Sequence, residues 1–415
     1  MLSEFFESAL RIQELHDSPE GQLIEKFAQE LYQTGYAEIT ARRHIRAAEH
    51  LIHWIGRKNS NVAALDERMI EEFVQHLNRC RCPRFGRTHR LDLRKGARLF
   101  LRYARFADLV TTRAVQETAV DPILLVSFAE WMRQQRGACE ATLYNYNLHL
   151  RDLLTILGED PARFDAQSLR QFILATSQRC GWAAAKKCTT AVRMFLRFLI
   201  ADGKCDASLE ASIPVLAHWR LSSLPRYLQS DEVERVIASC DPARPAGKRD
   251  RAILLLLARL ALRAGDIVQL RLGDLDWKEA GICVSGKGRR QTLLPLTQEV
   301  GDAIASYIRD GRPPTTADAV FIRSRAPFRA LANHCAVSMI VAQAMRRAGV
   351  TCPSRGAAHV LRHSVASSML RHGASLQEIA GVLRHRSTAT TEIYAKVDVV
   401  ALQQIAQPWP EAKSC

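Results

Sequence analysis

The chain has 415 residues, 47% of them apolar, which is enough for two to four domains with hydrophobic cores. It carries 58 Lys and Arg against 43 Asp and Glu, a net charge of +15, which favours a polyanionic partner such as nucleic acid. We expect no secretory signal, because no basic segment followed by an apolar core opens the chain, and no membrane span, because the longest apolar run, residues 252–258, is too short. The eleven cysteines form no disulfide-like framework, which is typical of the reducing cytoplasm.

An internal repeat occupies the first half of the chain. The run ITARRHIRAAEHLIHWIG (39–56) resembles ATLYNYNLHLRDLLTILG (141–158), and the segments that follow the two runs are also alike, in the same order and at similar spacing. Apolar residues recur near i, i+3, i+4 and i+7, which predicts a module of four or five helices in each copy. We expect these modules over residues 1–115 and 116–214.

Basic side chains recur among the helices of both copies. A single Lys or Arg in such a pattern is more often an ordinary solvated residue than a ligand contact. As sets, however, they are candidates for binding DNA phosphates: Arg42, Arg43 and Arg46 in the first copy, and Lys186, Lys187 and Arg193 in the second.

Beyond the repeat the sequence pattern changes. Residues 215–227 contain proline without periodicity and predict a linker. Residues 228–410 predict a mainly α-helical domain with a small sheet. Its expected elements are a helix that opens with a cap at Ser230, a long apolar helix over 249–263, short strands around 281–284 and 291–295, and helices to about residue 407.

One pair of cysteines raises the question of a metal. Cys80 and Cys82 lie near His76 and His89, and Cys and His side chains are the usual ligands of zinc. The C-x-C spacing, however, lacks the gap of two to four residues that is common in zinc sites. The sequence therefore predicts two thiols at a helix end, and no metal.

Four blocks of the last domain match a family pattern in order and spacing. RDRAILLLLARLALRAGDIVQLRLGDLDW, VSGKGRRQTLLPL, HVLRHSVASSML and GVLRHRSTATTEIYAKV resemble the signature blocks of tyrosine recombinases, also called integrases. The resemblance implies a mainly α fold: two tandem SAM-like helical core-binding modules, then a mostly helical catalytic domain with a small β-sheet. The catalytic residues it implies are Arg263, Lys287, His359, Arg362, His385 and Tyr394. Asp266 would orient catalytic residues, and Arg289 and Arg290 would hold a β-hairpin on the DNA backbone.

The chain departs from the family pattern at three places. The usual Thr-Gly before the first Arg is replaced by Leu260-Ala261. The acidic residue is Asp266, where Glu is commoner, and Arg384 precedes the late His, where Gly is usual. None of these changes removes a reactive group.

The residue types fit attack of a tyrosine on a phosphodiester. Two guanidiniums, Arg263 and Arg362, can clamp the negative charge of the pentacoordinate state. Lys287 can give a proton to the leaving 5′-oxygen, and His359 can act as base or proton shuttle at Tyr394. The product is a 3′-phosphotyrosine bond, whose energy is close to that of the bond broken, so no ATP, cofactor or metal is needed.

The remaining assignments follow from the same resemblance. His385 would donate a hydrogen bond to the phosphate, and Asp266 would orient Arg263 or the region of the late histidine. Tyr307 is the alternative tyrosine of this domain, but no His precedes it at a matching spacing. The apolar stripe from Val397 to Pro408 predicts a helix that docks on a neighbouring subunit or folds back on its own domain.

The leading hypothesis is a site-specific recombinase of a phage, plasmid or other mobile element. It would act on double-stranded DNA as a tetramer, with related recombinases as further candidate partners, in the nucleoid of the cytoplasm. The alternatives are a DNA-binding architectural protein with a decayed site, and a type IB topoisomerase, which shares the chemistry but exchanges no strands.

Overall fold

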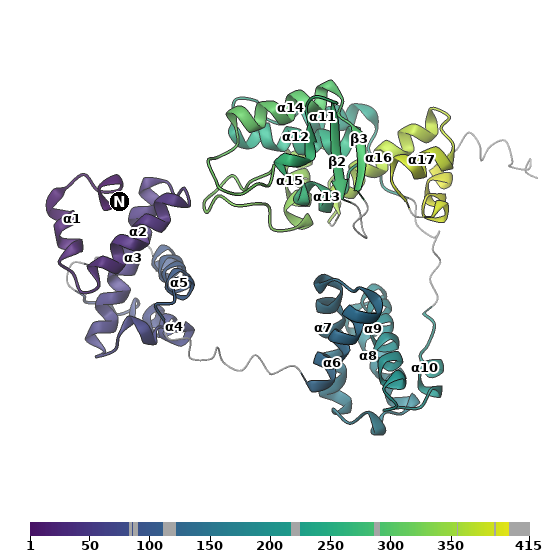
Figure 1. Cartoon of the computed structure of the whole chain (residues 1–415), viewed down its shortest axis with the longest axis horizontal. Coiled ribbons are helices and arrows are strands. Elements are labelled where there is room, and N and C mark those ends of the chain that lie inside the picture. Colours follow the sequence, from purple (N-terminus) through teal and green to yellow (C-terminus); the bar gives the residue numbers. More distant parts are fainter. Residues whose placement is uncertain are drawn as a thin grey trace, which may run out of the picture. The chain divides into compact units, whose positions relative to one another are not determined.

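The computed structural model describes residues 1–82, 85, 90–110, 122–216, 225–285, 291–354, 356–385 and 387–397. The chain divides into two compact units, residues 111–220 and residues 1–110 together with 221–415. Figure 1 labels the helices and strands of each part. No helix within the described ranges is long and apolar enough to cross a membrane.

The unit of residues 111–220 is wholly helical. It consists of α6 (Ile123–Arg136), α7 (Glu140–Leu157), the 3-10 turn η3 (Pro161–Arg163), α8 (Ala166–Cys180), α9 (Trp182–Ala201) and the short α10 (Ser208–Ser212). Asp165 caps α8 by accepting hydrogen bonds from the backbone N–H groups of Gln167 and Ser168. The core is formed by the apolar faces of the four long helices, with Phe128 and Phe195 fully buried at its centre.

The first 110 residues form a second helical module. After the turn η1 (Leu2–Glu4) come α1 (Ala9–His16), α2 (Gly21–Gln33), α3 (Glu38–Arg57), η2 (Val62–Ala64), α4 (Glu67–His76) and α5 (Arg90–Phe106). The long helices α3 and α5 pack against each other, and α2 covers them, so that a single core runs through the module.

The two modules repeat the same structural frame. Each has the order helix, helix, 3-10 turn, helix, helix, with α2 to α5 matching α6 to α9. Asp66 caps α4 as Asp165 caps α8. An edge-to-face aromatic pair lies in each core: Phe27 and Phe100 at 5.2 Å and 86°, and Phe128 and Phe195 at 5.4 Å and 87°. The similarity seen in the sequence is therefore a similarity of packing.

The C-terminal region carries the sheet. Its helices are α11 (Ser230–Ala238), α12 (Pro245–Arg259), α13 (Ala264–Gln269), α14 (Gln298–Asp310), α15 (His334–Arg347), α16 (Ala357–Arg371) and α17 (Leu376–Val382), followed by the turns η5 (Thr388–Thr390) and η6 (Glu392–Val397). The antiparallel sheet has the order β1-β2-β3, with β1 (Leu275–Asp276), β2 (Gly281–Ser285) and β3 (Gln291–Pro295). The apolar α12 lies in the core, where α14 and α16 pack on it.

The structure confirms the mainly α fold with a small sheet and corrects its details. The two expected strands are present, and β1, only two residues long, was not predicted. The apolar helix ends at Arg259 rather than at 263, because Ala261 takes a left-handed backbone conformation with φ of 48°. The helix cap expected at Ser230 is Gln229, one residue earlier. The helix expected after Val397 lies outside the described residues.

Candidate active site

Tyr394 lies in η6 and is almost wholly buried. Only 2% of its surface is exposed, and it packs in a small apolar cluster with Ala261, Ile379 and Leu383. Burial raises the pKa of its phenol to about 12. The hydroxyl is therefore neutral at physiological pH, and it could act as a nucleophile only if a neighbouring group took its proton.

That group can be His363, which the sequence analysis did not select. Its Nδ1 lies 2.7 Å from the Tyr394 hydroxyl oxygen. Burial, and then the nearby His359 and Arg362, lower the pKa of His363 to about 4, so the ring is neutral and can accept a proton. The signal was present in HVLRH, because residues four apart lie on the same side of a helix and His363 follows His359 by one turn of α16.

Two guanidinium groups converge beside the tyrosine. Arg362, on α16, is 4% exposed and donates hydrogen bonds to the carbonyls of Ala261 and Leu383. Arg263, at the start of α13, donates to the same Leu383 carbonyl at 3.3 Å and to that of Arg384 at 3.0 Å. Burial, and then the charge of Arg263, lower the pKa of Arg362 to about 10. Two cations held this close by neutral carbonyls favour the arrival of an anion.

Asp266 connects the first block to the last. Its Oδ2 accepts a hydrogen bond from the backbone N–H of Arg263 at 3.0 Å and lies 2.5 Å from Nη2 of Arg384. The sequence suggested that Asp266 orients either Arg263 or the region of the late histidine. In the structure the carboxylate contacts both, so it positions the backbone of the first arginine and the residue before His385 together.

The departures at Ala261 and Arg384 fall at unusual backbone positions. Both residues have positive φ, 48° and 51°. Left-handed backbone costs a non-glycine residue roughly 1–2 kcal/mol, which explains why glycine is usual there. Arg384 offsets this cost through its ion pair with Asp266, although its Nε and Nη1 are buried without a hydrogen-bond partner among the described residues. The backbone path is thus kept with side chains that do not favour it.

The two remaining histidines lie around the same centre. His385 follows Arg384, and its Nδ1 lies 2.8 Å from Oγ1 of the buried Thr391. Burial lowers the pKa of His385 to about 4, so its ring is neutral. His359 is exposed on α16, with its ring 6.4 Å from that of His363. Its exposure leaves it accessible to a bound substrate, whereas the contact with the tyrosine belongs to His363.

Two further expectations have different outcomes. Lys287, Arg289 and Arg290 lie outside the described residues, between the end of β2 and the start of β3.

Tyr307 is a core residue: it is 1% exposed, and its hydroxyl oxygen accepts a hydrogen bond from the Ile322 N–H at 3.1 Å. This structural use of its hydroxyl argues against Tyr307 as the nucleophile.

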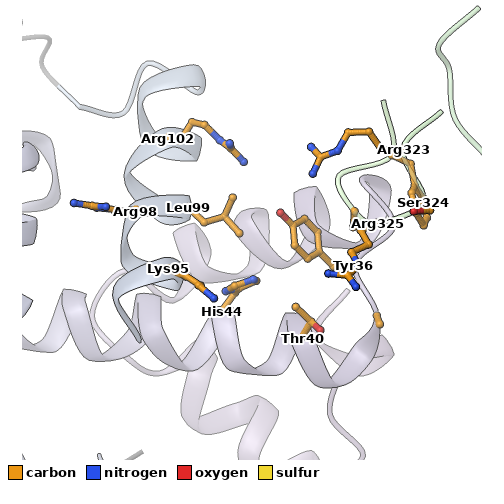
Figure 2. Close-up of a pocket in the computed structure, with 14 residues that line it drawn as sticks. Tyr36, Thr40, His44, Lys95, Arg98, Leu99, Arg102, Arg323, Ser324 and Arg325 are labelled. Atoms are coloured by element: carbon orange, nitrogen blue, oxygen red, sulfur yellow. The ribbon is translucent and has the colours of Figure 1, made fainter. Parts of the chain in front are cut away.

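The expected DNA-binding residues of the modules separate into two groups. Arg42 and Arg193 are partly buried. Arg42 donates a hydrogen bond to the backbone carbonyl of Phe5, and Arg193 donates to those of Ile213 and Pro214, so both stabilise the fold. The exposed members are Arg43, Arg46, Lys186 and Lys187. Further exposed cations, Lys95, Arg98 and Arg102, line a pocket on α5, with His44 and Thr40 of α3 also in its wall (Figure 2). The basic surface of the first module therefore extends beyond α3.

Comparisons with known proteins show the family to which the chain belongs. Residues 226–400 match the model of the phage integrase family. The chain is 34% identical over 402 residues, 94% of its length and 96% of the relative's, to a putative integrase/recombinase y4rA of Sinorhizobium fredii. It is 27% identical to the tyrosine recombinase XerD of Lacticaseibacillus casei, over 65% of this chain and 92% of that protein. The chain belongs to the phage integrase family of tyrosine recombinases.

A solved structure supports the same fold. The XerH site-specific recombinase, bound to its palindromic difH substrate after cleavage, matches with a TM-score of 0.52 and 18% identity. The match covers 86% of this chain and 95% of that one, so the shared fold extends well beyond the catalytic region.

Proposed function

We propose that this protein is a site-specific DNA recombinase in which Tyr394 attacks a backbone phosphate and forms a 3′-phosphotyrosine intermediate. The observation that carries the proposal is the hydroxyl of Tyr394, 2.7 Å from His363 and packed beside the paired Arg263 and Arg362. A nucleophile, a proton acceptor and a double cation are the parts that a phosphoryl transfer without a metal requires.

In the proposed reaction the phosphate enters between the two guanidiniums. As the phenolic oxygen forms its bond to phosphorus, its proton passes to the neutral His363, and the P–O bond to the 5′-oxygen breaks. Lys287 protonates that oxygen, His385 donates a hydrogen bond to the phosphate, and His359 assists proton transfer from its exposed position. Rejoining reverses these steps with a 5′-hydroxyl of another strand.

The same residues argue for an active enzyme over a decayed DNA-binding protein. An architectural protein has no need of the buried Arg362 beside the partly buried Arg263, because desolvating cations costs free energy. The full-length similarity to an integrase/recombinase favours recombination over a topoisomerase that exchanges no strands. We further propose that the protein serves a mobile element and acts as a homotetramer on two DNA duplexes, with related recombinases as further partners.

Covalent capture tests the proposal. The tagged full-length protein is incubated with nicked fragments of its own host's DNA, denatured and purified through the tag, and the attached DNA is sequenced. We expect wild-type protein to retain DNA, Tyr394→Phe to retain none, and Tyr307→Phe to behave as wild type. Mass spectrometry should find the phosphorylated peptide at Tyr394.

Two results would contradict the proposal. An adduct that persists in Tyr394→Phe would move the nucleophile elsewhere. Wild-type protein that binds DNA but never retains it after denaturation would favour the decayed, architectural alternative. Strand exchange between two captured sites, measured afterwards, separates a recombinase from a topoisomerase.

A further inference from the structure

Four metal-ligating side chains meet in the first module, far from Tyr394 in the sequence. They are His50 in α3, His76 at the end of α4, and Cys80 and Cys82 in the segment that follows α4. Sγ of Cys80 lies 3.4 Å from Nε2 of His50, and Sγ of Cys82 lies 3.3 Å from Nε2 of His76. All four donor atoms lie within 4.8 Å of one another.

This geometry is close to that of a tetrahedral zinc site. Bonds of about 2.3 Å to sulfur and 2.0 Å to nitrogen place the donor atoms of such a site roughly 3.3–3.8 Å apart. The two measured sulfur–nitrogen distances fall in this range. Two separate thiol–imidazole hydrogen bonds would explain each distance alone, but they do not require the two pairs to converge on a common centre.

The sequence alone predicts no metal here. It places Cys80 and Cys82 near His76 and His89, and His89 lies outside the described residues. The structure brings in His50 instead, 30 residues before Cys80. The packing of α3 beside the end of α4 supplies this ligand, and no local spacing rule includes it.

The surroundings suit a closed, structural centre. His50 is 1% exposed and Cys82 6%, and the ring of Phe85 stacks on that of His50 at 4.3 Å. Nη1 of Arg57 lies 3.9 Å from Sγ of Cys82, so a cation lies beside this sulfur atom. Two thiolates would balance a divalent cation, so the filled centre would bury no net charge.

We propose that His50, His76, Cys80 and Cys82 bind a structural zinc ion that fastens the segment after α4 to α3. With four protein ligands the metal has no open position, so it stabilises the module and takes no part in catalysis.

Metal analysis of the full-length protein tests this site. The protein is produced in zinc-supplemented medium under reducing conditions, desalted, and its zinc content measured. We expect about one zinc per chain in wild type and almost none in Cys80→Ser/Cys82→Ser. Cys139→Ser/Cys180→Ser is the matched control, because both cysteines are exposed in the other module, and it should keep the zinc of wild type.

Cobalt substitution tests the site first in the wild-type protein. Co²⁺ added to zinc-free wild-type protein should give the visible absorption of a tetrahedral ion with a thiolate charge-transfer band, and zinc should abolish it. His50→Gln should change this spectrum, because one nitrogen ligand is lost. The proposal is overturned if the wild type holds no zinc and gives no such spectrum, if both double variants lose zinc equally, or if mass spectrometry shows a Cys80–Cys82 disulfide in the reduced preparation.

Discussion

The two helical modules share a frame but secure it differently. Aligning Thr40 with Thr142 places Asp152 of α7 opposite His50 of α3, and aligning the capping residues Asp66 and Asp165 places Arg179 opposite Cys80. In the second module these positions hold an exposed ion pair, Arg179 to Asp152, at 3.0 Å. In the first module they hold the thiol and imidazole of the proposed zinc site.

The two modules also differ in the length of one connection. A single residue, Gly181, with φ of 80°, separates α8 from α9, so the second module closes with a tight turn. In the first module residues 77–89 separate α4 from α5. A longer connection loses more conformational entropy when it is ordered. The longer connection of the first module is the segment that the proposed zinc ion would fasten to α3.

The largest expected effect comes from the aromatic pair that the modules share. Phe100→Ala and Phe195→Ala should each cost about 3–5 kcal/mol, because each removes a fully buried ring. Hydrogen exchange measured by mass spectrometry should show faster exchange in α5 for the first variant and in α9 for the second. A zinc chelator should then further accelerate hydrogen exchange in Phe100→Ala, and should leave exchange in Phe195→Ala unchanged. If the chelator accelerated exchange equally in both variants, the proposal that zinc stabilises only the first module would be wrong.

A smaller effect is expected from the exposed cations. If both modules contact DNA phosphates, Arg43→Ala/Arg46→Ala and Lys186→Ala/Lys187→Ala should each lower the slope of log binding constant against log salt by about 2, since each phosphate contact contributes roughly 0.9. The exposed Arg68 and Arg163 offer control substitutions. Salt titration of binding to the captured DNA measures the slopes. An unchanged slope in the first pair alone would restrict DNA contact to the second module.

The sequence predicted what depends on local pattern. The helical repeat and the two main strands follow from periodicity, which is a property of the local sequence. His363 was passed over because its hydrogen bond to Tyr394 exists only once α16 and η6 pack together. The left-handed backbone at Ala261 and Arg384 was equally hidden, since neither residue type favours it. His50 belongs to the same class, because it meets Cys80 only through the packing of helices.

The exposed ion pair of the second module should contribute the least to stability. Asp152→Ala removes the ion pair between Asp152, whose side chain is 49% exposed, and Arg179, whose side chain is 63% exposed. Exposed pairs contribute at most about 1 kcal/mol, because water screens the charges and two flexible side chains lose entropy. Hydrogen exchange in α7 and α8 should therefore change little, and added salt should reduce even that change. In the first module, His50→Ala should accelerate exchange in α3 and α4 strongly, since a metal ligand is lost. If the two substitutions had equal effects, the first module would be held by ordinary packing and hydrogen bonds, and metal would have no part in the difference between the copies.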